Sequence, residues 1–208
     1  MERVEANICQ SVYNLKGQSL NTTYCILDLE TTGLSPIDNE IIEVGILKVK
    51  DNKIIDTFHS YIKPKIKLTE RIIKVTNITN EKLERFEHID TIYPKIIQFL
   101  GNEKEIAIVG HNVNFDIRFM KQNATNLGYE FNYTYLDTYS LSKVLFPNLD
   151  THKLGRIKEH LKIKLPESEN TLDVDIILLE VFNEIMDMLK NKGVNNLENI
   201  NTLFAVEP

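Results

Sequence analysis

Short apolar runs separated by turn-forming residues predict five β-strands in this chain. They lie at residues 24–29, 41–49, 54–62, 106–109 and 133–136. The polar residues 50–53 separate the second run from the third, so we expect those two runs to form a β-hairpin and to continue the first run as an antiparallel meander. The first and fourth runs are continuously apolar and lead into acidic sequence, which is typical of buried strands that end at a site.

Apolar residues recur at helical spacing in the remaining segments. The helices predicted from this spacing lie at residues 68–83, 89–100, 114–127, 138–145, 153–161 and 168–190. Gly101, Gly128 and Gly193 follow three of them, where a glycine commonly ends a helix. A meander followed by alternating strands and helices indicates an α/β domain with a mixed sheet, and its two strands that lead into acids should lie side by side at the centre.

We expect residues 21–190 to form this domain, with an extension at each end. Residues 1–20 form the N-terminal extension, in which apolar residues at helical spacing predict a helix. These apolar residues are Val4, Ile8, Val12 and Leu15. Residues 191–208 are Asn-rich and predict a loose C-terminal tail. Leu203 and Phe204 in this tail would be costly to expose, so we expect them either to fold back on the domain or to dock into a partner protein.

The composition indicates one acidic globular domain. The chain has 208 residues, of which 42% are hydrophobic and 26% charged, and its net charge is −6. A protein that holds nucleic acid by its own positive charge is usually basic, so contact with nucleic acid would be local or would depend on bound cations. No apolar run is long enough to span a membrane, and the N-terminus lacks a signal peptide. Cys9 and Cys25 lack metal-ligand spacing, so we expect an intracellular, cytoplasmic protein.

Two carboxylates, Asp28 and Glu30, stand at the end of the first predicted strand. Residues i and i+2 of a strand share a face, so these side chains repel each other unless a cation lies between them. The sequence HNVNFD follows the fourth strand and opens a helix, which Asn112 or Asn114 would cap. Asp116 would then lie in the first helical turn and face the same edge of the sheet. Each feature alone also has an ordinary explanation as a turn or capping acid.

A third acidic pair, Asp173 and Asp175, lies near the start of the long predicted helix. The two lie about 200° apart around a helix, so only one of them can face the other acids. Together, the three segments supply four carboxylates. Mg²⁺ and Mn²⁺ prefer carboxylate ligands, and four of them suit two such ions. Two such ions, about 4 Å apart, can activate a water molecule and stabilise the leaving oxygen of a phosphodiester. Bound cations would also allow an acidic protein to hold nucleic acid.

Four motifs together resemble the DEDD 3′–5′ exonucleases. They are CILDLETTGL at 25–34, EIIEVG at 40–45, HNVNFD at 111–116 and LDT at 136–138. The resemblance covers about residues 22–190. Within the family, the chain is most similar to the proofreading epsilon subunit of bacterial DNA polymerase III and to the exonuclease domain of the Gram-positive replicative polymerase. It implies a ribonuclease H-like fold, with a mixed five-stranded sheet flanked by helices. It also implies two-metal hydrolysis from a 3′ end, in which nucleoside monophosphates are released.

The resemblance assigns roles to residues by position. The metal ligands would be Asp28, Glu30, Asp116 and Asp175. The residues that meet the terminal nucleotide would be Thr31, Gly33 and Leu34. The residues that shape the pocket floor would be His111, Asn112 and Phe115, the last of which we expect to point inward.

The last motif departs from the family, in which a His or a Tyr precedes the fourth acid and the His acts as general base. No His or Tyr occurs between Leu161 and Pro208. Asn170 followed by Asp175 keeps the spacing of the His branch, which makes Asp175 the preferred fourth acid. A gapless alignment places Glu169 at the base position, and a one-residue deletion nominates Asp173 instead.

An asparagine cannot take a proton near neutral pH, and loss of a general base costs about 10²–10⁴ in rate. Two classes of function therefore stay open. The first is a metal-dependent 3′–5′ exonuclease acting on single-stranded or frayed 3′ ends of DNA in replication or repair, or on RNA. The second is a weakly active or inactive module that binds nucleic acid or protein through the same groove. A polymerase or a sliding clamp would be the protein partner.

Overall fold

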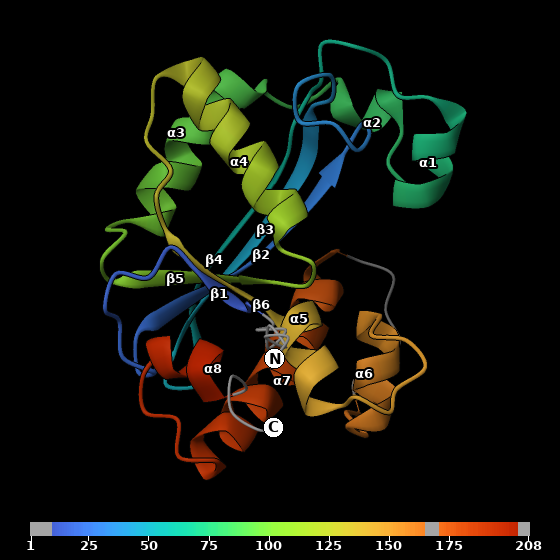
Figure 1. Ribbon diagram of the computed structural model, residues 1–208. Helices are drawn as coiled ribbons and strands as arrows, with labels where there is room; N and C mark the ends of the chain where they lie inside the picture. The colour runs from blue at the N-terminus through green and yellow to red at the C-terminus, as the bar shows by residue number, and fades with distance from the viewer. Residues whose placement is uncertain (1–9, 165–170, 204–208) are drawn as a thin grey trace, which may run out of the picture.

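The computed structural model describes residues 10–164 and 171–203, and the side chains of residues 171–173 and 203 lie outside that description. A mixed six-stranded sheet forms its centre, with strand order β1-β6-β5-β2-β3-β4 (Figure 1). The strands are β1 (Val12–Tyr13), β2 (Thr23–Thr31), β3 (Ile41–Lys50), β4 (Lys53–Tyr61), β5 (Ile106–Gly110) and β6 (Thr134–Asp137). β2, β3 and β4 form the predicted antiparallel meander, and β2 pairs in parallel with β5. The expectation that the two strands leading into acids are central neighbours is confirmed.

The sheet has one strand more than the five predicted. The additional strand, β1, pairs antiparallel with β6 and lies in the segment where we expected a helix. The helix prediction is wrong for residues 12–13, because Val12 is fully buried against the sheet and pairs with Leu136. A strand of two residues is too short for alternation to be visible in the sequence. Residues 1–9 lie outside the described residues.

Helices cover both faces of the sheet (Figure 1). They are α1 (Glu70–Thr76), α2 (Asn80–Leu83), α3 (Ile89–Leu100), α4 (Asn114–Leu127), α5 (Thr138–Leu145), α6 (Leu154–His160), α7 (Thr171–Asn191) and α8 (Glu198–Leu203). The predicted helix at 68–83 is two helices, because Asn77 adopts a left-handed φ of 56° that ends α1, and Thr79 caps α2. Within the described ranges no helix is both long enough and apolar enough to cross a membrane.

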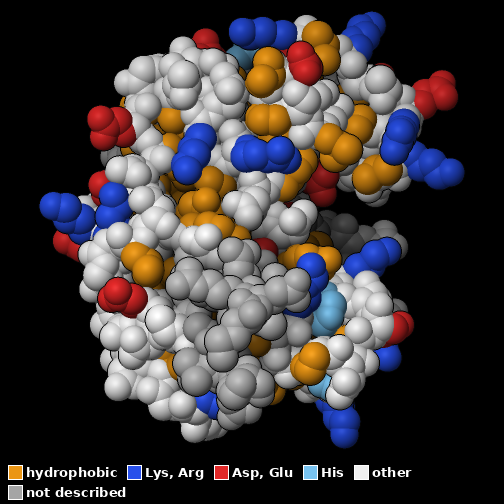
Figure 2. All heavy atoms as spheres, viewed as in Figure 1, with side chains coloured by type: hydrophobic (Ala, Val, Ile, Leu, Met, Phe, Trp, Pro, Cys, Tyr) orange, Lys and Arg blue, Asp and Glu red, His pale blue; other side chains and the backbone are white. Residues whose placement is uncertain are grey.

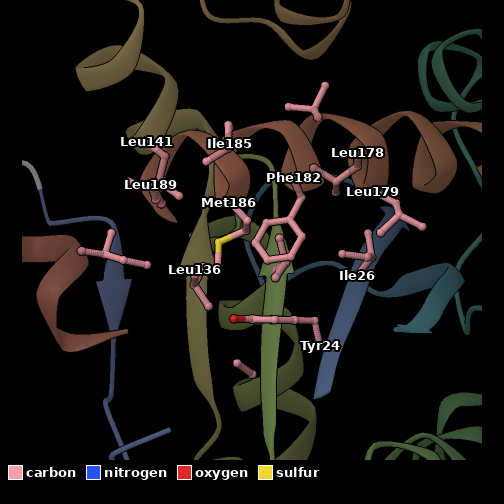
Figure 3. Packing of buried hydrophobic residues seen from close by; sticks show 14 of the residues in the cluster. Tyr24, Ile26, Leu136, Leu141, Leu178, Leu179, Phe182, Ile185, Met186 and Leu189 are labelled. Atoms are coloured by element: carbon pink, nitrogen blue, oxygen red, sulfur yellow. The ribbon is translucent and has the colours of Figure 1, made fainter. Parts of the chain in front are cut away.

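The long helix α7 packs along β2 and its neighbours through the apolar stripe that its sequence predicts (Figure 3). Phe182 and Ile185 of this stripe are fully or almost fully buried, and the Phe182 ring meets the Tyr24 ring edge-on at a centroid distance of 4.8 Å. The alternate side chains of β2, including Cys25, face α3 and α4 on the opposite side. Both faces of β2 are therefore covered, and the start of α7 is held against the ends of β2 and β3.

The N-terminal and C-terminal segments pack against each other. The Asn201 side chain of α8 accepts hydrogen bonds from the backbone N–H groups of Ser11 and Val12, each at 3.0 Å, and donates to the Val12 carbonyl at 2.8 Å. Leu197 and Ile200 are fully buried. The prediction of a loose tail is therefore wrong for residues 194–202. The Leu203 side chain and Phe204 lie outside the described residues.

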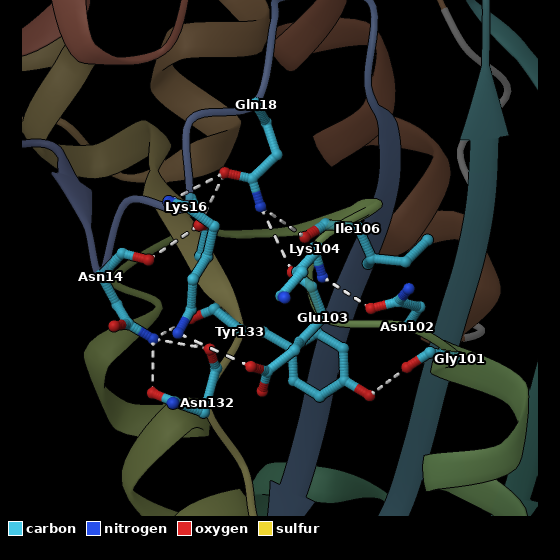
Figure 4. A network of polar contacts seen from close by, with 11 residues as sticks. Asn14, Lys16, Gln18, Gly101, Asn102, Glu103, Lys104, Ile106, Asn132 and Tyr133 are labelled. Carbon is cyan, nitrogen blue, oxygen red and sulfur yellow. Dashed lines mark hydrogen bonds and ion pairs between the residues drawn. The ribbon is translucent and has the colours of Figure 1, made fainter.

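The segment that follows β1 is tied to the sheet by polar contacts (Figure 4). The Gln18 amide donates to the carbonyls of Glu103 and Ile106, each at 3.3 Å, and its oxygen accepts from Thr134 Oγ1 at 3.0 Å. The Asn14 amide donates to the Asn132 carbonyl at 2.7 Å. These contacts hold the segment before β2 to the ends of β5 and β6 where those strands begin, away from the acidic residues.

Candidate active site

The central strand β2 carries the first two acids to its C-terminal end. Asp28 and Glu30 point to the same face as Tyr24, which is the face covered by α7. Asp28 lies opposite Gly45 of β3, and Glu30 lies opposite Glu43. The register shifts directly after Glu30, so the strand turns away at the position where its carboxylates end. The alternation in the sequence predicted this shared face correctly.

Asp175 of α7 lies over Gly45, beside Asp28. A Cβ atom built on Gly45 would collide with Asp175 Oδ2 and would lie 3.3 Å from Asp175 Cγ. Asp175 is completely buried, yet neither of its carboxylate oxygens has a hydrogen-bond partner among the described residues. An unpartnered buried carboxylate is costly, so a native protein places one where another ligand satisfies it. Gly45 is thus the residue that makes room for a helix-borne acid against the sheet.

Asp116 lies in the first turn of α4 and is 5% exposed. The helix begins differently from our expectation, because its N-cap is Val113, which makes no side-chain hydrogen bond. The predicted capping by Asn112 or Asn114 is therefore wrong. Asn112 instead adopts a left-handed φ of 62°, a conformation that asparagine tolerates better than most residues. The turn into α4 thus brings Asp116 back to the end of β2.

Asp137, at the end of β6, performs the capping that we had assigned to asparagine. Its Oδ1 accepts hydrogen bonds from the backbone N–H groups of Asn112 at 2.8 Å, Val113 at 3.3 Å and Tyr139 at 3.2 Å. One buried carboxylate thereby ties the start of α4 to the start of α5. We had noted the LDT motif but had given this acid no role. An acid at the end of an apolar strand was the available signal.

The four candidate ligands affect one another electrostatically. Burial raises the pKa of Asp28 to about 6 and of Glu30 to about 7, and the charge of Glu43 adds to both increases. Burial, then the charges of Asp28 and Glu43, raise the pKa of Asp175 to about 8. Burial and the charge of Asp28 raise the pKa of Asp116 well above its ordinary value. At neutral pH the Asp175 carboxyl therefore stays largely protonated unless a positive charge replaces its proton, and the raised pKa values of the other three show the same effect.

Another buried carboxylate, Glu43, was not among the predicted site residues. It is 1% exposed, and its Oε1 lies 2.7 Å from His59 Nε2 of the edge strand β4. Its charge raises the pKa of Asp28, Glu30 and Asp175. The sequence signal for this position was a glutamate inside the apolar run of β3. An acid buried in such a run is costly unless it has a partner or a function.

The donor set fits divalent cations of the Mg²⁺ and Mn²⁺ class. All of its candidate ligand atoms are carboxylate oxygens, which these hard ions prefer. The unpartnered Asp175 oxygens and the raised pKa values both indicate an environment that lacks one positive charge or more. In the described part of the chain, no three His, Cys, Asp or Glu side chains are already arranged around one point as metal ligands. Mutual repulsion of carboxylates favours rotamers that hold such charges apart.

The three residues expected to meet the terminal nucleotide lie at the end of β2 and on the loop that follows it. Thr31 is buried and its hydroxyl donates to the Gly33 carbonyl at 2.6 Å. Gly33 packs so closely on Asn39 that a Cβ would lie 2.7 Å from Asn39 Cγ. Leu34 is 79% exposed at the tip of this loop. The loop thus places an apolar side chain in solvent beside the acids, as a surface for a base would require.

The residues expected at the pocket floor lie after β5. His111 Nδ1 is 3.0 Å from Thr138 Oγ1, and its ring meets the Tyr139 ring at a centroid distance of 5.6 Å. Burial lowers the pKa of His111, although the charge of Asp137 opposes this effect. Phe115 is partly buried and packs on Phe119 with ring centroids 5.0 Å apart, so it points inward as expected.

The base position of the last motif lies outside the part of the chain that the structure describes. Glu169 and Asn170 lie outside the described residues, as does the Asp173 side chain. Of the two alternatives for the fourth acid, Asp175 is the one whose side chain is described, and it lies beside Asp28 on Gly45.

Comparison with known sequences supports the motif assignment. A family model described as an exonuclease, RNase_T, matches residues 25–168. A PolC-type DNA polymerase III from Caldanaerobacter subterraneus subsp. tengcongensis is 34% identical over 186 residues, a match that covers 89% of this chain. The match covers 13% of that polymerase, so the chain spans about one eighth of the length of this relative.

Two solved structures share the fold. One is exonuclease X in complex with 5′ overhanging duplex DNA, with a TM-score of 0.67, 20% identity and coverage of 87% of this chain and 99% of that chain. The other is the nuclease domain of 3′hExo, a DEDDh family member bound to rAMP, with a TM-score of 0.67, 20% identity and coverage of 84% and 94%. The ribonuclease H-like class of fold predicted from the motifs is confirmed. The extent of the family match shows that this chain belongs to the exonuclease family.

Proposed function

We propose that this chain is a 3′–5′ exonuclease that hydrolyses phosphodiester bonds of DNA and releases nucleoside monophosphates, with two divalent cations, Mg²⁺ or Mn²⁺, as cofactors. One observation carries the proposal beyond family membership. Asp175 is buried without a hydrogen-bond partner among the described residues, on a glycine that lies directly opposite Asp28. A purely structural acid would have donors around it.

The residues that would hold the cations are Asp28, Glu30, Asp116 and Asp175. When bound, such cations supply a water molecule of lowered pKa and positive charge for the scissile phosphate. Asp28 has the central place, because its charge raises the pKa of Glu30, Asp116 and Asp175 alike. Glu43 lies opposite Glu30 and restricts where that carboxylate can go.

The relatives support DNA as the substrate. The polymerase from Caldanaerobacter is named a DNA polymerase, and exonuclease X was solved with DNA. Because one structural neighbour was solved with rAMP, RNA is the alternative substrate to compare with DNA. We also propose a polymerase or a sliding clamp as the protein partner, and a role in proofreading or repair.

A second candidate rests on the substitution at the base position. Asn170 stands where the resemblance expects a histidine, and an asparagine cannot accept the proton of the attacking water. The chain would then bind a 3′ end and release product weakly or not at all. Glu169 is the adjacent carboxylate that could replace the base, in which case full activity would be retained.

A polarity assay tests both candidates. A 5′-labelled single-stranded DNA is incubated with Mn²⁺, with Mg²⁺ or with EDTA, and products are separated on a gel while free mononucleotides are measured by chromatography. We expect a ladder shortened from the 3′ end, with release of mononucleotides in either metal and none in EDTA. An RNA of the same sequence ranks the substrates.

The matched control is Asp116→Asn, which removes one ligand charge from a buried position with little change of shape. It should abolish release. Equal release by this variant would show that the cleavage comes from a contaminant or from another site. Binding of the labelled DNA without any release by the unchanged protein would favour the second candidate.

A further inference from the structure

The segment around α6 is strongly basic in an otherwise acidic chain. Residues 153–164 contain five Lys or Arg side chains and one acid, Glu159, whereas the whole chain has a net charge of −6. The basic residues are Lys153, Arg156, Lys158, Lys162 and Lys164. We refer to residues 153–164 as the basic segment. Such a concentration requires an account, because like charges in one short segment repel each other.

Most of this positive charge forms no ion pair with the acids that the structure describes. Arg156 is the exception, since it makes ion pairs with Asp150 at 3.1 Å and with Glu159 at 3.0 Å. The four lysines have no acidic partner in the part of the chain that the structure describes. Lys153, Lys162 and Lys164 are exposed, while Ile157 on the other side of α6 is fully buried. The helix is therefore anchored by its apolar side, and the exposed lysines flank it at both ends, where they have no acidic partner among the described residues.

The basic segment begins beside His111, one of the residues expected at the pocket floor. His152, the residue before it, lies with its Nδ1 3.1 Å from Ser142 Oγ of α5, and its backbone is a hydrogen-bond partner of His111. His111 directly follows β5, the strand next to β2. Six residues, 165–170, separate the end of the segment from α7, the helix that carries Asp175. Both of its ends are thus connected to elements that contribute residues to the site.

The surface view agrees with this placement. Figure 2 shows the molecule hollowed between the part that holds α1 and α2 and the part that holds α6, with Lys and Arg side chains on both sides of the opening and His side chains on the α6 side. Asp28 and Glu30 lie at the end of β2 and Asp175 lies near the start of α7. Figure 1 shows α6 beside α5, and α6 also packs against α7. When the 3′ end of a strand occupies the acidic site, the nucleotides that precede it in the strand lie along this opening.

We propose that the basic segment binds the phosphate backbone of the single strand that lies upstream of the 3′-terminal nucleotide. This inference rests on the proposed function, because it assumes that a nucleic-acid 3′ end occupies the acidic site. Metal ions there can neutralise the phosphate that is cut, but they do not reach the phosphates behind it. Unpaired lysines beside the site supply that attraction and release counterions from the strand when it binds. Such contacts are independent of sequence, as degradation of any strand requires.

Charge reversal tests the inference. The test variant is Lys153→Glu/Lys162→Glu/Lys164→Glu, which changes three exposed lysines of the basic segment. The control variant is Lys95→Glu/Lys104→Glu/Lys192→Glu, with the same change of net charge. These control lysines are exposed on α3, before β5 and after α7, away from the ends of β2 and β5 where the acids lie. Equal melting temperatures would establish that both variants fold.

Two substrates separate strand binding from the chemical step. One is a single-stranded oligonucleotide and the other is the p-nitrophenyl ester of thymidine 5′-monophosphate, which has no upstream strand. We expect the ratio of kcat/KM for the oligonucleotide to kcat/KM for the ester to fall about tenfold or more in the test variant and to stay unchanged in the control. We also expect the slope of log Kd for the oligonucleotide against log salt to become shallower by about 2, at ~0.7 for each lost phosphate contact.

Equal ratios and equal salt slopes in the two variants would overturn the inference, since both carry the same net charge. If the unchanged protein hydrolyses neither substrate in Mn²⁺, the proposed function fails, and the inference fails with it. Hydrolysis of the ester with unaltered ratios would leave the proposed function intact and remove only the role of the basic segment.

Discussion

A glycine and a buried acid define the site at the scale of single residues. Gly45 has no side chain where Asp175 lies against the sheet, and its strand partner is Asp28. The missing Cβ is therefore what allows a helix and two strands to bring carboxylates together. This is a steric requirement and not a matter of backbone conformation, so it applies to any larger residue at position 45.

Gly45→Ala should impair activity and Mn²⁺ binding, because the new methyl group occupies the place of the Asp175 carboxylate. We also expect a loss of about 1–3 kcal/mol in the free energy of unfolding, the usual cost of overpacking. Gly155→Ala is the matched control. Nothing lies within 4 Å of a Cβ built there, and α6 should gain about 0.5–1 kcal/mol from the substitution. Denaturant unfolding and steady-state kinetics check both, and an active Gly45→Ala protein would contradict the steric account.

The base position gives a second prediction at this scale. Asn170→His should raise the cleavage rate by up to about 10²–10⁴ if Asn170 stands where the family has its general base. The pH–rate profile should also acquire a limb near the pKa of an imidazole, about 6.5. A gain for Glu169→His in place of Asn170→His would support the gapless alignment. A large loss on Glu169→Gln would show that this glutamate already acts as the base.

Sequence reasoning at this scale succeeded where spacing alone decides which way a side chain points. Asp28 and Glu30 share a face because strands alternate, and Asp116 follows from a helix that starts after a buried strand. Glu43 and Asp137 were missed because their roles depend on cross-strand and cross-helix contacts. Such contacts join residues far apart in the sequence, and no local period reports them.

At the scale of elements, the two terminal segments stabilise the edge of the sheet. β1 extends the sheet beyond β6, and α8 is bound to β1 through the Asn201 side chain. The five predicted strands all appear within a few residues of their expected bounds. Four of them bury an apolar run, and the mostly exposed β4 follows from the short hairpin turn after β3. β1 and α8 could not be predicted, since their order comes from each other and from β6.

Asn201→Ala should destabilise the protein by about 1–3 kcal/mol, because it removes the hydrogen bonds that the Asn201 side chain makes to the backbone of Ser11 and Val12. Thr202→Ala is the control: this exposed neighbour donates to the Asn199 carbonyl of the same helix, and its loss should cost little. Chemical denaturation measures both free energies, and hydrogen exchange of the Val12 amide locates the effect. Equal stability of the two variants would mean that α8 does not hold β1.

At the scale of the whole molecule, the repulsion among the acids links stability to pH and to metal. Glu30 and Asp175 have pKa values of about 7 and about 8, above those of an unfolded chain. Between pH 6.5 and 8.5 the folded state therefore holds more protons than the unfolded state, so the stability of the metal-free protein falls as pH rises. The lowered pKa of His111 has the opposite sign but acts mainly below pH 6.5.

We expect the free energy of unfolding in EDTA to fall by about 1–3 kcal/mol across this pH range, at up to 1.36 kcal/mol per pH unit and group. Saturating Mn²⁺ should remove most of that fall, because the cation stabilises the deprotonated carboxylates. Asp175→Asn should give a shallower dependence in EDTA. Thermal unfolding at several pH values measures all three, and a stability that rises with pH in EDTA would contradict the assigned cause.

The central claim is that the acids from β2, α4 and α7 form one divalent-metal site. The most direct measurement is an anomalous difference map from crystals grown with Mn²⁺ and a nucleoside monophosphate. The account predicts two peaks about 4 Å apart. Their ligands should be carboxylate oxygens of Asp28, Glu30, Asp116 and Asp175. Metal peaks at other residues in crystals of active protein, with none at these four carboxylates, would contradict it.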